Sequence, residues 1–140
     1  MSEEQAQQLL YQMQVLESYA SNLDQKEQAI ISILREAMSS IESIKGIMQN
    51  PNAESLIPMG LGTYVKANMQ GGSTILLDVG AGIVVEKDHE SAINYLESKI
   101  KEFQVALNET GAQKHETLLR LDQLKQEMDH MIQSSKKSSQ

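Results

Sequence analysis

A strict heptad pattern limits what this chain can fold into more than any other feature of its sequence. From Leu9 to Met48, steps of four and three residues connect twelve positions, of which eleven are apolar and one is Glu27. The mean step is about 3.5 residues, which is the period of a left-handed coiled coil. We therefore expect one long helix within residues 1–50, with its apolar seam against a partner helix.

A second heptad seam lies near the C-terminus, between Ile93 and Met131. Nine of its twelve positions are apolar. The three polar positions are consecutive: Thr110, Lys114 and Thr117. The pattern predicts a second long helix over 88–133, in which Asp88 caps the N-terminus. The Ser, Lys and Gln residues of 134–140 cannot bury apolar surface, and we expect a disordered tail there.

The two seams match each other when the chain folds back on itself. If Met48 lies near Ile93 in an antiparallel pair, the numbers of facing residues sum to 140 or 141 in all twelve layers. This alignment places Glu27, the one charge of the first seam, opposite Lys114, the one charge of the second. Polar layers cost stability but fix alignment. We interpret Glu27 and Lys114 as a register pair, whereas a chance match would leave the two side chains uncoupled.

The segment between the helices, residues 51–87, has a different composition. Six of the eight glycines lie within 56–87, and Pro51 and Pro58 stand at its start. Glycine and proline interrupt helices and form turns. Four short segments alternate or are apolar: 56–59, 63–69, 74–79 and 83–86. They predict two β-hairpins, with hairpin-type turns at Gly71-Gly72 and at Gly80-Ala81-Gly82.

Two hairpins are too small to be stable alone in water. A two-helix coiled coil uses its apolar stripe on itself, so we expect it to give the hairpins little cover. The sequence thus predicts an α+β fold, a long antiparallel coiled coil with two central β-hairpins that assemble with sheets of other chains. The residues expected to mediate this oligomerisation are Val65, Ala67, Met69, Ile75, Leu77, Val79, Ile83 and Val85.

The end of the coiled coil far from the hairpins is rich in apolar and flexible side chains. We call the following the tip residues: Leu9, Leu10, Tyr11, Met13, Met128, Met131 and Ile132. Methionine-rich apolar surfaces suit binding of varied partners. A client-binding site is one interpretation. The other is an ordinary coiled-coil end with scattered exposed apolar residues, which are common.

Composition narrows the possible functions. The net charge of −7 argues against a general affinity for nucleic acids or anionic membranes, because both require a basic surface. The absence of cysteine excludes disulfides and thiolate chemistry. The N-terminus is acidic and no apolar run is long enough to span a membrane, which favours a soluble protein in the cytoplasm.

Candidate catalytic and cofactor motifs are weak. Gly60-Leu61-Gly62 and Gly80-Ala81-Gly82 lack the rest of a phosphate-binding motif, and we interpret them as turns. The acidic and histidine residues of 86–90 are better explained by a helix cap than by a metal site. No nucleophile and base are paired in the pattern. We therefore expect no enzymatic activity, no metal and no cofactor.

Two stretches of the central segment carry a specific resemblance. Residues 56–67, LIPMGLGTYVKA, resemble the first hairpin of alpha-class prefoldin subunits, and residues 75–87, ILLDVGAGIVVEK, resemble the second. The sequence of these stretches resembles archaeal members of the family more than eukaryotic ones. The resemblance implies a hexamer of two alpha and four beta subunits, held by a double β-barrel from which coiled coils project.

The same resemblance implies a function. The tip residues would hold non-native proteins without ATP and pass them to a group II chaperonin. The alternative that the sequence leaves open is a filament-forming scaffold, built on the same platform with the coiled coils as spacers.

Overall fold

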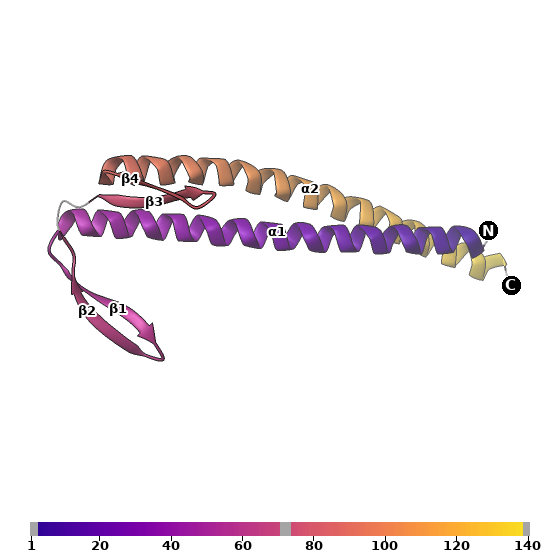
Figure 1. Cartoon of the computed structure of the whole chain (residues 1–140). Helices are drawn as coiled ribbons and strands as arrows, with labels where there is room; N and C mark the ends of the chain where they lie inside the picture. The colour runs from indigo at the N-terminus through magenta and orange to yellow at the C-terminus, as the bar shows by residue number, and fades with distance from the viewer. Residues whose placement is uncertain (1–2, 71–73, 139–140) are drawn as a thin grey trace. The chain divides into compact units, whose positions relative to one another are not determined.

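The computed structural model describes residues 3–70 and 74–138. The elements in chain order are helix α1 (Glu3–Gln49), strands β1 (Glu54–Gly60), β2 (Thr63–Asn68), β3 (Ile75–Gly80) and β4 (Ile83–Lys87), and helix α2 (His89–Ser138) (Figure 1). The predicted fold class, two long helices around two small hairpins, is confirmed.

The chain forms two compact units, each containing a part of both helices. The first comprises residues 1–32 and 104–140, and the second comprises residues 33–103. Within the first unit, Ala6 and Met131 line one groove and Leu16 and Leu124 line another. Because the numbers rise along α1 as they fall along α2, the helices of this unit are antiparallel, as the matched seams predict.

Burial follows the predicted seams in both units. The buried seam positions are Leu9, Ala20, Leu23, Ile30, Leu34, Ile41 and Ile44 on α1, and Thr110, Thr117, Leu121 and Leu124 on α2. The remaining seam positions are half-buried, except Met48, which is 50% exposed. Leu124, at 1% exposure, is the most completely buried leucine, and burying such a side chain contributes about 1.5–3 kcal/mol.

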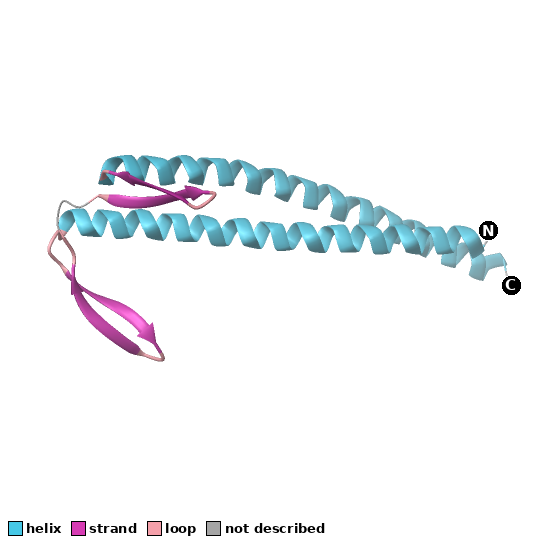
Figure 2. Ribbon diagram, viewed as in Figure 1, coloured by secondary structure: helices cyan, strands magenta, loops and turns pink. Residues whose placement is uncertain are grey.

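Each hairpin is a separate two-stranded antiparallel sheet (Figure 2). β1 pairs with β2 around Gly60-Leu61-Gly62, and β3 pairs with β4 around Gly80-Ala81-Gly82. Both turns need residues at positive φ, with 114° at Gly60 and 104° at Gly80, which glycine adopts without a Cβ clash. The turn predicted at Gly71-Gly72 lies outside the described residues, and the strands before and after it, β2 and β3, belong to different sheets.

The expectation that the helices give the hairpins little cover is wrong for β3–β4. Leu77 of β3 is buried against Ile44 of α1 and Ala92 of α2. The half-buried side chains packed around them are Ile75, Val85, Ile93, Tyr95 and Leu96. Ala92 is fully buried although it lies outside the predicted seam, and it belongs to the same cluster as Leu77 and Ile44.

The two ends of α2 differ in how well they follow the prediction. At the start, Asp88 acts as the expected cap, because its Oδ1 accepts a hydrogen bond from the Ser91 backbone N–H at 2.7 Å. At the other end, the helix continues to Ser138 instead of ending at residue 133. The predicted disorder therefore does not hold for 134–138. Lys136 and Lys137 stand in the last turn, where positive charge favours the helix terminus.

Candidate functional site

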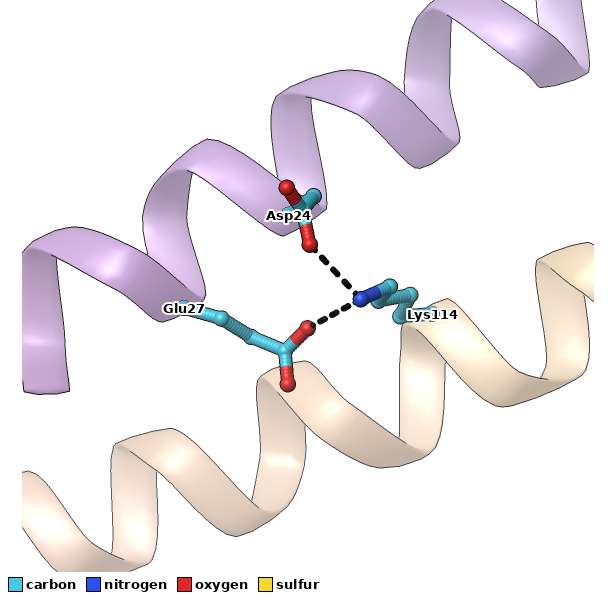
Figure 3. A network of polar contacts seen from close by, with 3 residues as sticks. All are labelled: Asp24, Glu27 and Lys114. Atoms are coloured by element: carbon cyan, nitrogen blue, oxygen red, sulfur yellow. Dashed lines mark hydrogen bonds and ion pairs between the residues drawn. The ribbon is translucent and has the colours of Figure 1, made fainter.

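A half-buried polar layer joins the two helices of the first unit. Lys114 Nζ lies 2.7 Å from Asp24 Oδ1 and 2.9 Å from Glu27 Oε1 (Figure 3). The structure thus brings together the two residues of the predicted register pair. The hydrogen bond to Asp24, and then the contact with Glu27, raise the pKa of the Lys114 ammonium to about 12. Lys114 therefore remains charged throughout the physiological pH range.

Sequence analysis did not identify Asp24 as a member of this layer. Asp24 lies outside the heptad seam, so the layer pattern gave no reason to pair it with Lys114. It does precede Glu27 by three residues, and residues at that spacing are neighbours on a helix surface. That spacing is the signal that could have found it.

The two polar positions beside Lys114 behave differently. The Thr110 hydroxyl donates to the Ala106 carbonyl oxygen and the Thr117 hydroxyl to that of Gln113, both at 2.8 Å. Both threonines are buried, and their polar atoms have acceptors on their own helix. The polar contact across the seam in this region is therefore made by Lys114.

The tip residues divide into two groups by exposure. Leu9 is buried in the seam, and the methionines are half-buried: Met13, Met128 and Met131. Leu10 is 49% exposed, Tyr11 68% and Ile132 47%. Those three lie outside the seam, and they are the apolar tip side chains that a partner could reach.

Two shallow grooves that contain tip residues are lined by both helices of the first unit. One, of about 480 Å³, is lined by Glu3, Ala6, Met128, Met131, Ile132, Ser135 and Lys136. The other, of about 340 Å³, is lined by Tyr11, Gln12, Val15, Leu16, Arg120 and Leu124. Val15 and Tyr19, both about half exposed, were missed by the sequence reading. The i, i+4 spacing from Tyr11 to Val15 and Tyr19 would have revealed them.

The residues predicted to mediate oligomerisation do not form one free surface. Leu77 is buried against the helices of its own chain, and Ile75 and Val85 are half-buried beside it, so Leu77 does not lie on a free surface of the chain. The role of these residues in oligomerisation stays a prediction. Ala67 and Met69 are half-buried, while Val65, Val79 and Ile83 are at least 43% exposed. The exposed apolar residues that the prediction omitted are Leu56, Ile57, Met59, Leu61, Tyr64, Leu76 and Val84.

The described residues contain neither a cluster of metal-ligating side chains nor a membrane-spanning helix. Within 3–70 and 74–138, no group of three or more His, Cys, Asp or Glu side chains is arranged to hold a metal ion. Asp88, from the acidic cluster near 86–90, is instead the cap of α2. In the same part of the chain, neither helix is apolar over a stretch long enough to span a membrane.

Comparison with known proteins decides the family. The family model described as "Prefoldin subunit" matches residues 13–134. The chain belongs to the prefoldin family. The resemblance of its two hairpins to alpha-class prefoldin subunits is confirmed by relatives named "Prefoldin subunit alpha".

Two such relatives are archaeal. The prefoldin subunit alpha of Nitrosopumilus maritimus is 46% identical over 140 residues, which covers 100% of this chain and 97% of the relative. That of Methanospirillum hungatei is 31% identical over 118 residues and covers 79% of this chain and 76% of the relative.

Solved prefoldin structures share the fold. The prefoldin beta subunit from Thermococcus strain KS-1 superposes with a TM-score of 0.65 at 19% identity, covering 91% of both chains. The filamentous PFD of Methanocaldococcus jannaschii gives a TM-score of 0.57 at 19% identity, covering 89% of this chain and 98% of that one. Membership of the prefoldin family gives the chain a chaperone-type function.

Proposed function

We propose that this prefoldin subunit binds non-native proteins at its tip residues without ATP and passes them to a group II chaperonin. The observation that carries the proposal is the exposure of Leu10, Tyr11 and Ile132 beside three half-buried methionines. An unfolded polypeptide exposes apolar segments, and these side chains offer them a flexible apolar surface. Such contacts need no nucleotide and no reacting group.

Weak binding at each tip suits this function. A groove as shallow as those at the tip buries little of a client, so each contact is easily broken. Several subunits that hold one client together gain avidity, because the second contact is intramolecular. Release to a chaperonin then requires breaking weak contacts one at a time.

We further propose that the subunit works in a hexamer of two alpha and four beta subunits in the cytoplasm. Support comes from hairpin β1–β2, on which Leu56, Tyr64 and Val65 are each about half exposed or more. A two-stranded sheet with apolar residues open to water is marginally stable. Contact with other subunits would cover these residues.

A tip variant tests the holdase proposal. Leu10, Tyr11 and Ile132 are replaced by Ser in the assembled hexamer, and Val105→Ser, at a 57% exposed site of the same unit, is the matched control. We expect the triple variant to lose most of its suppression of client aggregation, measured by light scattering, while the control keeps it. Native mass measurement verifies that both hexamers are intact.

Full suppression by an intact triple variant would reject tip binding. Open-ended assembly of the purified chain, with no suppression even in the wild type, would favour the filament-forming scaffold. Turnover of any substrate that survives repurification would contradict the proposed absence of enzymatic activity.

We also propose that Glu27 and Lys114 fix the register of the two helices. Lys114→Leu leaves the half-buried Glu27 carboxylate without its counter-charge, and Glu27→Leu leaves Lys114 with Asp24 as its remaining partner. Replacing both with apolar residues separates only the more exposed Asp24 from its partner. We therefore expect Glu27→Leu and Lys114→Leu each to lower the Tm more than the double variant. Additive effects in this double-mutant cycle would reject the role, and Asp24→Asn measures the share of the third member.

A further inference from the structure

The groove between Tyr11 and Arg120 combines apolar surface with a positive charge. Tyr11 and Val15 form its α1 wall and are 68% and 49% exposed, and Tyr19 continues the same stripe one turn later. Leu16 and Leu124 form the floor, where the two seams meet. The groove thus offers an aromatic and aliphatic strip with a guanidinium at its edge.

Arg120 has no carboxylate partner in the described part of the chain. Its side-chain contact is a hydrogen bond from Nη1 to Gln123 Oε1 at 3.3 Å. Carboxylates of the described residues are instead paired with lysines, among them Lys66, Lys99 and Lys114. In a chain with a net charge of −7, an unpaired guanidinium beside an apolar groove is a local reversal of the prevailing sign.

Arginine suits this position chemically. Its planar fork binds a carboxylate through two parallel hydrogen bonds and also stacks on aromatic rings. Arg120 is one of 2 arginines among the 12 basic residues of the chain. Gln12, which lines the same groove, adds an amide that can donate to and accept from a peptide backbone.

We propose that this groove binds apolar segments of non-native polypeptide that carry an Asp or Glu side chain. The apolar residues lie over Tyr11 and Val15, and the carboxylate pairs with Arg120. The inference rests on the proposed function, and adds a class of client segment to it. The neighbouring groove contains both Glu3 and Lys136 and gives no such preference, so it accepts apolar segments irrespective of charge.

The test compares two labelled peptides that differ in one residue. Both carry the same apolar and aromatic sequence, one with a central Glu and the other with Gln. Fluorescence anisotropy measures their affinity for the assembled hexamer. We expect the wild type to bind the Glu peptide about two- to fivefold more tightly, the range of an exposed ion pair, and the difference to shrink at high salt.

Variants of Arg120 separate its charge from its packing. Arg120→Gln should remove the preference and leave the affinity for the Gln peptide unchanged. Arg120→Glu should reverse the preference toward a peptide with a central Lys. Lys125→Gln is the matched control, since it removes a charge from the same stretch of α2 at a residue that does not line the groove. It should keep the wild-type preference.

Each outcome bears on one proposal or on both. Equal affinity of the wild type for the two peptides, or a preference that survives Arg120→Gln, would overturn the inference and leave the holdase function standing. If neither peptide binds the wild type, both proposals are overturned. If Arg120→Gln changes the mass of the particle, the groove is a contact between copies of the chain, and the inference is wrong.

Discussion

The two hairpins of this chain are alike locally and different in their surroundings. Each turns through a Gly-X-Gly sequence whose middle residue has a positive φ, 48° at Leu61 and 54° at Ala81. Each shows a register shift just before the turn. Yet β3–β4 buries Leu77 against its own helices, whereas no residue of β1 or β2 is buried. Similar local sequences thus give the same turn but different packing.

The difference lies in which faces are covered. In β3–β4, the face with Ile75 and Leu77 packs on the helices, whereas the other face leaves Leu76 and Val84 exposed. In β1–β2, Ile57 pairs with Val65 on one face and Leu56 and Tyr64 occupy the other, and no residue of either strand is buried. The comparison indicates that β3–β4 belongs to the core, and it leaves β1–β2 as the proposed assembly surface.

The largest expected effect is on stability at Leu77. Leu77→Ala removes a buried side chain and should lower the free energy of unfolding by about 2–5 kcal/mol. Leu76→Ala is the matched control, because Leu76 is the same residue type on the same strand but is 64% exposed. It should change stability by less than about 0.5 kcal/mol in urea unfolding followed by circular dichroism. Equal losses would mean that β3–β4 does not belong to the core.

The next effect is on assembly through β1–β2. Replacing Leu56 and Tyr64 by Ser should weaken binding to beta subunits at least about tenfold, because two apolar side chains lose their cover. Unfolding of the chain alone should hardly change. Titration calorimetry with beta subunits measures the loss, and Met38→Ser, at a 51% exposed site on α1, serves as the control. Unchanged affinity in the double variant would remove β1–β2 from the assembly surface.

A smaller effect is expected where β4 joins α2. The Ser91 backbone N–H donates to Asp88 and lowers the pKa of its carboxyl below the ordinary 3.8. Such a group stabilises the fold above its unfolded pKa, and the contribution is lost as pH falls through the folded pKa. Asp88→Ala should lower the Tm by a few degrees at pH 7 and remove this dependence below pH about 4.

Asp88→Asn provides the control for the cap, because Asn also caps helices but does not titrate. It should keep most of the Tm at pH 7 and lose the acid dependence. If Asp88→Ala and the wild type lose stability in parallel below pH 4, the carboxylate does not contribute in the way described.

The smallest effect is at the turns. Ala81→Gly relieves a non-glycine residue at positive φ and should stabilise the chain by about 0.5–1 kcal/mol, because β3–β4 is packed on the core. Leu61→Gly relieves the same conformation in β1–β2, but it should leave the main thermal transition unchanged. A rise in Tm from Leu61→Gly equal to that from Ala81→Gly would show that both hairpins unfold together with the helices.

Much of the fold could be predicted because helix burial depends on a periodic pattern that a sequence displays directly. The seams predicted nearly every buried helix position, including the layer at Glu27 and Lys114. The exceptions are Ala92, which is buried outside the seams, and Met48, a seam position that is exposed. Met48 was expected to face Ile93, but Ile93 packs against the cluster of Ile44, Leu77 and Ala92. A period shows which face is apolar but not which element covers it.

The heptad pattern predicted only part of the candidate site. Leu10, Tyr11 and Ile132 were expected to be exposed because they lie outside the seams, and they are. The groove between Tyr11 and Arg120 depends on the rotation of one helix against the other, which no single pattern encodes. Asp24 was not predicted either, because it lies outside the heptad seam of α1 and still contacts Lys114 on α2.

Thr110 and Thr117 form their side-chain hydrogen bonds within α2, and this has a consequence for the alignment of α1. Each hydroxyl already donates to an acceptor on α2. If α1 shifted along α2 by one heptad, no hydrogen bond of either threonine would therefore be broken. In the three layers of Thr110, Lys114 and Thr117, the polar cost of such a shift therefore comes from separating the Lys114 ammonium from the carboxylates of Asp24 and Glu27.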